Sequence, residues 1–283
     1  MCHAILLISS PDERGITASV TDFIYKNNGN IIHADQHIDE QNNTFFMRIE
    51  WSLDGFNIDK DDVAGQLKPI TEKFQMKWEL SFTDQRPQVA IFVSRHLHCL
   101  QDLLYRHKSG QLSCNIPLII SNHSDAKSLV KDFGIKFLEI PITEDNKKDQ
   151  EEKEIEALHK ANIDLIVLAR YHQVLTANFV SSFPNRIINI HHSFLPAFAG
   201  KNPYLQAYQK GVKIIGATSH YVTEQLDEGP IIEQSTVRIS HRDSLDDLVR
   251  KGEDLERVVL NRALRLALHK KILSYDNKTI IFD

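Results

Sequence analysis

The sequence has 283 residues, of which 42% are hydrophobic and 25% are charged, values that are ordinary for a globular protein and argue against extensive disorder. With 33 Lys and Arg residues against 38 Asp and Glu residues, the net charge of −5 excludes a whole-chain basic footprint for nucleic acid. No apolar run reaches the ~18 residues that span a bilayer, and three scattered cysteines predict neither a disulfide framework nor a zinc site. Because the first residues also lack a basic signal-peptide region, we expect a cytoplasmic protein with no membrane segment.

The first 82 residues are predicted to form one unit. An apolar run at residues 3–9 predicts a strand, and apolar positions at helical spacing predict a helix over residues 16–28. Two strands, a second helix and a last strand are predicted to follow at residues 31–39, 44–53, 59–74 and 76–82. The resulting order βαββαβ is typical of the ferredoxin-like fold.

A polar stretch with a proline then predicts a linker, and we place the boundaries at residues 1–83, 84–88 and 89–283. Beyond it, near-continuous apolar runs alternate with helical stretches, which indicates a doubly wound, mostly parallel sheet in an α/β domain. The predicted strands of this sheet are residues 89–94, 116–121, 136–140, 164–169, 186–190, 216–223 and 231–239. The predicted helices are residues 97–107, 125–133, 147–161, a short one at 176–182, and a long amphipathic one at 244–273.

Two polar clusters follow strands of this sheet, where doubly wound folds place their sites. Asn189 and His191 are two residues apart in an extended stretch, so their side chains leave the same face. An amide beside an imidazole can polarise a carbonyl group and move a proton. The alternative is that Asn189 caps a turn and His191 is an ordinary loop histidine.

The second cluster contains Asp227, in a tight acidic loop that ends in Gly229-Pro230. Read alone, the segment is well suited to a plain β-turn, and that interpretation of Asp227 is favoured. The loop at residues 94–99 has no glycine pattern for a dinucleotide, and the histidines show no metal-ligand spacing. We therefore expect no dinucleotide cofactor and no metal.

Taken together, residues 189–222 (NIHHSFLPAFAGKNPYLQAYQKGVKIIGATSHYV) and 223–234 (TEQLDEGPIIEQ) resemble the folate-dependent formyltransferase superfamily. In that superfamily the catalytic set is an Asn, a His two residues later and an Asp in an L-D-x-G-P loop. The resemblance implies that Asn189, His191 and Asp227 are catalytic.

Within the superfamily the chain is similar to the deformylases of 10-formyltetrahydrofolate. It has a doubled His191-His192, lacks a Gly-Ser-Asn-rich phosphate loop at residues 93–104, and begins with a domain similar to an ACT module. The bulky His and Arg side chains of the loop at residues 94–99 are suited to closing an acceptor site, so that water replaces an amine as the nucleophile. The resemblance implies hydrolysis of 10-formyltetrahydrofolate to formate and tetrahydrofolate, which supplies formate for purine biosynthesis and balances one-carbon folate pools.

The implied mechanism uses water as the acceptor and no cofactor. Asp227 assists the attack of water, directly or through His191, as general base. Asn189 and protonated His191 stabilise the tetrahedral oxyanion, and His191 passes a proton to the leaving nitrogen.

The resemblance also implies a folate pocket. Its expected substrate-binding residues are Tyr171, His172, Gln173, Val174, Leu175, His192, Ser193, Thr223 and Glu224. His172 departs from the superfamily, where Met is usual, and either re-tunes pterin binding or points away. Val174 and Leu175 are open to a second interpretation, as core residues.

For the ACT-like domain, the resemblance implies an amino-acid effector, methionine or glycine, and a homo-oligomer, dimer or tetramer. The expected effector loop contains Asp12, Arg14, Gly15 and Ile16, although an ordinary βα turn explains the same residues. Two other functions stay open: transfer of the formyl group to an amine, and a non-catalytic amino-acid sensor whose large domain only binds folate.

Overall fold

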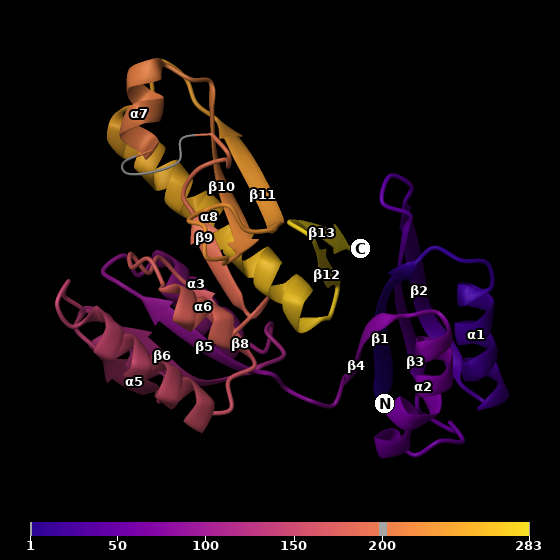
Figure 1. Cartoon of the computed structure of the whole chain (residues 1–283). Helices are drawn as coiled ribbons and strands as arrows, with labels where there is room; N and C mark the ends of the chain where they lie inside the picture. Colours follow the sequence, from indigo (N-terminus) through magenta and orange to yellow (C-terminus); the bar gives the residue numbers. More distant parts are fainter. Residues whose placement is uncertain (1, 198–202, 283) are drawn as a thin grey trace. The chain divides into compact units, whose positions relative to one another are not determined.

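The computed structural model describes residues 2–197 and 203–282, which group into two compact units (Figure 1). One unit contains Met1–Arg86, Lys270–Leu273 and Ile280–Asp283, and the other contains Pro87–His269 and Ser274–Thr279. The sequence-based boundaries assigned residues 270–273 and 280–283 to the second domain. Residues 198–202, part of the segment that carries the family resemblance, lie outside the described residues.

The first unit is a four-stranded antiparallel sheet in the order β2-β3-β1-β4. Its elements are β1 (His3–Pro11), α1 (Ile16–Lys26), β2 (Asn30–Asp39), β3 (Thr44–Ser52), the 3-10 turn η1 (Lys60–Asp62), α2 (Val63–Lys73) and β4 (Lys77–Phe82). Alternate residues of β1 and β3, such as Leu6, Ile8 and Trp51, share one core with Val20 of α1 and Leu67 of α2. Both helices therefore cover the same face of the sheet, and the ferredoxin-like prediction is confirmed (Figure 1).

The second unit is built on a seven-stranded sheet in the order β11-β10-β9-β8-β5-β6-β7. The strands are β5 (Gln88–Val93), β6 (Asn115–Ser121), β7 (Lys136–Glu139), β8 (Leu165–Leu168), β9 (Ile187–His191), β10 (Ile214–Tyr221) and β11 (Ile231–Arg238). β5 to β9 are parallel, whereas β10 is antiparallel to both β9 and β11. The prediction of a doubly wound, mostly parallel sheet is confirmed.

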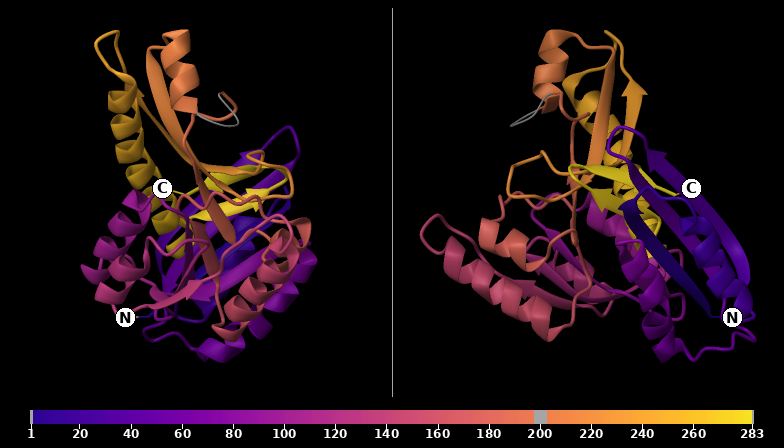
Figure 2. Two further views of the ribbon diagram at one scale, coloured as in Figure 1. Left: turned by 90° about the vertical axis from the view of Figure 1, so that its left-hand side faces the viewer. Right: turned by 45° about the vertical axis from the view of Figure 1, so that its right-hand side comes forward.

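Helices cover both faces of this sheet. They are α3 (His98–Lys108), α4 (Lys127–Asp132), α5 (Lys147–Lys160), α6 (Ala177–Ser182), α7 (Pro203–Lys210) and α8 (Leu245–Leu268). Leu158 of α5 and Phe179 of α6 pack in one core with Phe92, Ile120 and Ile166 of the strands. α8 lies along β10 and β11, as Figure 2 shows. Among the described residues, none of the helices combines the length and the apolar character that a membrane span requires.

Two regions differ from the sequence-based prediction. The long helix predicted to residue 273 ends at Leu268, and a hairpin of β12 (Ile272–Tyr275) and β13 (Lys278–Ile281) follows it. Lys270 (φ +51°) and Asp276 (φ +47°) are left-handed, so the helix stops and the chain reverses at these residues. α7 was not predicted, because its eight residues lie in a segment read only for its polar groups.

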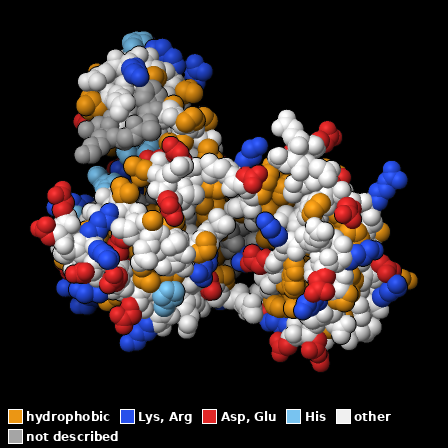
Figure 3. Space-filling view, viewed as in Figure 1, with side chains coloured by type: hydrophobic (Ala, Val, Ile, Leu, Met, Phe, Trp, Pro, Cys, Tyr) orange, Lys and Arg blue, Asp and Glu red, His pale blue; other side chains and the backbone are white. Residues whose placement is uncertain are grey.

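On the face shown in Figure 3, Lys and Arg side chains are interspersed with Asp and Glu side chains.

Candidate active site

Asn189 and His191 lie at the carboxyl end of β9, on alternate positions of an extended strand. Their side chains therefore leave the same face of the sheet, as predicted. Because β10 runs antiparallel to β9, its residue His220 lies directly opposite Asn189. The antiparallel strand thus adds a second histidine to the site.

His220 orients the amide of Asn189. We assign the proton of the buried His220 ring to Nδ1, because this atom lies 2.9 Å from the carbonyl oxygen of Tyr221, which can only accept. In the neutral ring Nε2 is then an acceptor, and the Asn189 amide donates to it at 3.2 Å. One N–H of the Asn189 amide is used in this way, and the second remains for a ligand.

Asp227 reaches the same place from the loop between β10 and β11. It adopts φ +57°, a left-handed conformation that Asp tolerates better than most residues. Its Oδ2 atom lies 3.2 Å from Nδ1 of His191, while the other oxygen is 3.7 Å from Nε2 of His220, too far for a hydrogen bond. Burial acts to raise the pKa of Asp227, but the bond from His191 outweighs it and holds the pKa well below its ordinary value. Asp227 is therefore a carboxylate at neutral pH.

The second ring nitrogen of His191, Nε2, is buried and has no hydrogen-bond partner among the described residues. A buried polar atom of this kind is costly unless a ligand or water completes it. With Nδ1 held by Asp227, the His191 ring can take up or give a proton at Nε2. The catalytic roles of Asn189, His191 and Asp227 stay a prediction.

These groups line a single cavity of about 510 Å³. One wall is formed by residues 170–175 and another by residues 222–227, with residues 189–192 between them. Two apolar side chains of the lining remain exposed, Val174 at 52% and Leu226 at 62%. A cavity lined by a few clustered polar groups and by separate apolar side chains is typical of a small-molecule site.

The expected substrate-binding residues line this cavity, with one exception. Ser193 lies outside it, because its hydroxyl turns back and donates to the carbonyl of Ala197 at 2.9 Å. The Tyr171 ring packs against Phe92 in the core, and its hydroxyl donates to Glu154 at 3.0 Å. Tyr171 therefore acts mainly as an anchor for its segment.

The loop after β5 also holds the segment expected to bind folate. The hydroxyl of Ser94 accepts the backbone N–H of His172 at 3.0 Å and donates to Asn122 at 2.7 Å. The ring of His172 lies T-shaped against His96 with the ring centroids 5.4 Å apart. His172 lines the cavity.

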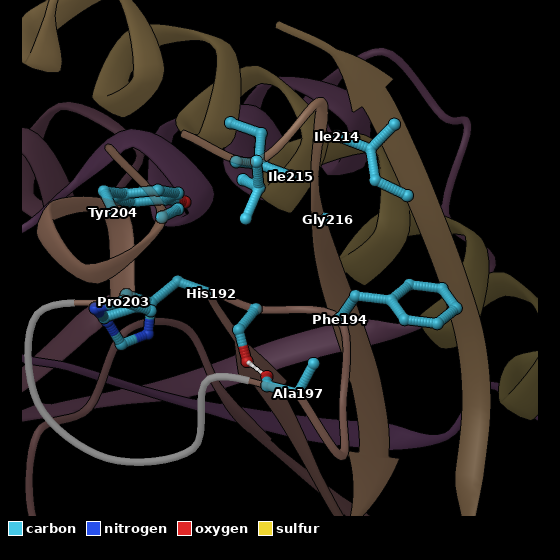
Figure 4. A pocket seen from close by; sticks show the side chains of 11 residues that line it. His192, Phe194, Ala197, Pro203, Tyr204, Ile214, Ile215 and Gly216 are labelled. Carbon is cyan, nitrogen blue, oxygen red and sulfur yellow. Dashed lines mark hydrogen bonds between the residues drawn. The ribbon is translucent and has the colours of Figure 1, made fainter. Parts of the chain in front are cut away.

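A second, apolar cavity of about 190 Å³ adjoins this region (Figure 4). Tyr204 and Ile215 face each other across it, and Phe194 lies near Gly216 (Figure 4). A Cβ atom at Gly216 would lie 2.8 Å from the Cβ of Phe194, so a larger residue here would displace that side chain. His192 lines both cavities and so forms a shared wall.

A buried ionic network lies behind this wall, and the sequence analysis missed it. Glu256 of α8 is fully buried and accepts hydrogen bonds from the Tyr204 hydroxyl (2.6 Å) and from Nε2 of His98 (2.8 Å). Nε of Arg170 lies 3.5 Å from the same carboxylate. Burial acts to raise the pKa of Glu256, but His98 and Arg170 outweigh it and lower the pKa to about 2. The signal in the sequence that could have revealed this network is a carboxylate, Glu256, on the apolar face of a predicted helix.

Three residues of this region, His98, Cys99 and Glu256, lie close enough together to be considered as ligands for a metal ion. Both Glu256 oxygens already accept hydrogen bonds, and the Arg170 cation lies beside them. Burial raises the pKa of Cys99 well above its ordinary value, whereas a metal needs the thiolate. The donor chemistry therefore favours a hydrogen-bonded network over a metal site.

The expected effector loop lies at the start of α1. Gly15 adopts φ +98° and begins the helix, and the Ile16 side chain is buried in the core of the first unit. The backbone N–H of Asp12 donates to the carbonyl of Asn43, and Arg14 is exposed. Ile16 thus has a packing role, and effector binding by this loop stays a prediction.

The chain matches the Formyl transferase family over residues 87–264. It is 57% identical over 279 residues to a formyltetrahydrofolate deformylase from Synechocystis sp., which covers 99% of this chain and 98% of that protein. A crystal structure of a formyltetrahydrofolate deformylase from Pseudomonas syringae has a TM-score of 0.98 at 43% identity, covering 100% of this chain and 95% of the other. A glycinamide ribonucleotide transformylase from Symbiobacterium toebii, 30% identical, reaches a TM-score of 0.65 and covers only 70% of this chain, although 95% of its own. The chain belongs to the formyl transferase family and, within it, to the formyltetrahydrofolate deformylases.

Proposed function

We propose that this protein hydrolyses 10-formyltetrahydrofolate to formate and tetrahydrofolate. The observation that carries the proposal is the meeting of Asn189, His191 and Asp227 on the wall of one cavity. Deformylase relatives that match over nearly the whole chain support the same activity. In one-carbon metabolism the reaction regenerates free tetrahydrofolate and supplies formate for purine synthesis.

In the proposed reaction, His191 is the immediate general base. The Asp227 carboxylate, ionised and paired with Nδ1, is by itself a weak base, and it makes Nε2 the basic atom of the ring. Water loses a proton to Nε2 as its oxygen bonds to the formyl carbon. Asp227 stabilises the imidazolium that forms, without accepting the proton itself.

Asn189 stabilises the tetrahedral intermediate. Its second amide N–H donates to the oxyanion, while the first is held by His220. Collapse of the intermediate breaks the bond between the formyl carbon and the folate nitrogen, and that nitrogen takes the proton from Nε2 of His191. Formate leaves as the carboxylate with release of one proton to water.

The folate is proposed to lie between residues 170–175 and the loop at residues 222–227. The exposed side chains of Val174 and Leu226 offer apolar contact to the pteridine and benzoyl rings. Of the expected pocket, Ser193 is not needed by this arrangement, because its hydroxyl is bonded to Ala197.

Formate release from 10-formyltetrahydrofolate, with no amine added, tests the proposal. We expect steady release by the purified protein and its loss in Asp227→Asn. Turnover that appears only after glycinamide ribonucleotide or another amine is supplied would instead establish a transferase. Folate binding without any turnover would leave the sensor function.

Regulation and assembly are further proposals. Methionine or glycine is expected to change the rate of formate release by binding the ACT-like domain, which in a homodimer or homotetramer would link the subunits. Rates measured with 10 to 1000 µM of each amino acid (about the range that spans weak and tight effector binding), beside alanine as control, test the effector. A rate that none of them changes removes it.

A further inference from the structure

Arg170 has a cationic side chain without a full set of partners in the wall of the catalytic cavity. Its side chain is nine-tenths buried, and its Nε atom has no hydrogen-bond partner among the described residues. The residue adopts φ +64°, an uncommon conformation for a side chain other than glycine. Residues with strained, left-handed backbones concentrate at functional sites, so the conformation of Arg170 points to a role in ligand binding.

Glu256 only partly satisfies this cation. The two carboxylate oxygens already accept hydrogen bonds from His98 and Tyr204, and the distance to Nε of Arg170 is 3.5 Å. That distance allows attraction but not a normal charge-assisted bond, which is shorter than about 3 Å. A planar guanidinium is shaped to hold a second carboxylate through two parallel bonds.

The side chains around Arg170 favour an anion as well. His172 and His192 line the same cavity. Burial and the charge of Arg170 lower the pKa of His172 to about 4 and that of His192 to about 3. Both rings are therefore neutral at pH 7 and can donate one N–H each. The Tyr204 ring, T-shaped against His192 at 5.8 Å, fixes the orientation of that ring (Figure 4).

We propose that Arg170 holds the carboxylate product, formate, as it leaves the catalytic groups. The inference rests on the proposed hydrolysis, which makes a small carboxylate in this cavity. The folate molecule carries carboxylates too, on its glutamate tail. However, Arg170 is nine-tenths buried and lies beside the fully buried Glu256, whereas the exposed end of the cavity is at Val174 and Leu226. A small anion fits the buried end, and a long tail fits the exposed end.

Direct binding of ¹³C-formate, followed by NMR saturation transfer at constant ionic strength, tests the proposal without turnover. A ligand of three non-hydrogen atoms binds no tighter than about 1 mM, so formate is titrated from about 0.5 to 100 mM. We expect Arg170→Gln to weaken binding by about 10- to 100-fold, the range for losing a hydrogen bond to a charged group. Glu256→Gln should tighten it, because the competing negative charge is gone. The exposed Arg242→Gln, at a position outside the residues that line the cavity, is the matched control and should bind as the wild type does.

Each outcome bears on the proposal. Because Arg170→Gln leaves Glu256 buried with two partners, it is checked by thermal unfolding beside the double variant Arg170→Gln/Glu256→Gln, in which both charges are removed. Unchanged formate binding in a folded Arg170→Gln protein refutes the inference, even where hydrolysis is fully established. A rise in the KM for 10-formyltetrahydrofolate with unchanged formate binding would instead assign Arg170 to the glutamate tail. A wild-type protein that binds formate but releases no formate from 10-formyltetrahydrofolate would overturn the proposed function, while the anion site at Arg170 would remain supported.

Discussion

Replacing Asp227 with Asn removes one negative charge and little else. Asn is close in shape to Asp and also tolerates the left-handed φ of +57° at this position, so the loop should keep its course. The Nδ1 atom of His191 keeps an oxygen acceptor at 3.2 Å. What is lost is the charge that stabilises an imidazolium in the transition state.

The distance sets the size of the effect. Two unit charges 3.2 Å apart attract each other by about 5 kcal/mol at an effective dielectric constant of about 20. The neutral hydrogen bond that remains contributes about 1 kcal/mol. The difference of about 4 kcal/mol corresponds to a fall in kcat of about 1000-fold. Because the neutral ground state gains much less from the charge, KM should change only a few-fold.

Formate release under substrate saturation measures this fall, with Glu228→Gln, an exposed neighbour in the same loop, as the matched control. Circular dichroism and thermal unfolding establish that both variants fold. A folded Asp227→Asn protein within about tenfold of the wild-type kcat (~1.4 kcal/mol) would show that the carboxylate is only a turn residue. The mechanism through His191 would then be wrong.

Three further predictions concern the oxyanion donor, the histidine that orients it, and the stability of the folded chain. Asn189→Ala should lower kcat for formate release by about 100- to 1000-fold, the usual loss for one oxyanion donor, and a near-normal kcat would remove Asn189 from the mechanism. His220→Phe should lower kcat by about 3- to 10-fold, because the hydrogen bond from the Asn189 amide to His220 is lost. His220→Gln should recover part of the activity, since its side-chain carbonyl can still accept that bond. An equal loss in both variants would show that His220 acts only through packing. Burial raises the pKa of Glu154 to about 7. Between about pH 4.5 and 7 the folded state therefore binds more protons than the unfolded state. The free energy of unfolding should fall by about 3 kcal/mol as the pH rises through that window. Thermal unfolding should therefore show Glu154→Gln gaining stability over wild type at pH 8 but not at pH 4, while the exposed Glu152→Gln gains none; a pH-independent difference contradicts this.

Local sequence patterns predicted the elements well where one periodicity ran through the whole segment. The buried strands of the large sheet and the βαββαβ order of the first unit are examples. The helix predicted over residues 244–273 shows the limit, because apolar residues continue past Leu268, whereas Lys270 is left-handed and β12 begins at Ile272. Propensity and spacing decide the existence of an element better than its end.

The candidate site was predictable to a similar depth. Strand alternation is enough to place Asn189 and His191 on one face, and the family pattern adds Asp227. The contact between His98 and Glu256 joins residues 158 positions apart, and no local pattern encodes such a pair. The position of His220 opposite Asn189 follows from the antiparallel register of β10, which a strand prediction without pairing does not contain.

The network around Glu256 also bears on the choice between water and an amine as acceptor. Asn189, His191 and Asp227 would serve either nucleophile, so they do not decide between hydrolysis and transfer. Beside them, Glu256 holds His98 and Tyr204 through bonds of 2.8 and 2.6 Å, and Tyr204 packs on His192 in the cavity wall.

Removing one partner of a buried ion pair costs about 3–5 kcal/mol, so we expect this wall to resist displacement by a bulky amine. Water needs no such opening. A wall of mutually bonded, desolvated side chains therefore favours hydrolysis by excluding the larger competitor, while leaving the catalytic groups themselves unchanged.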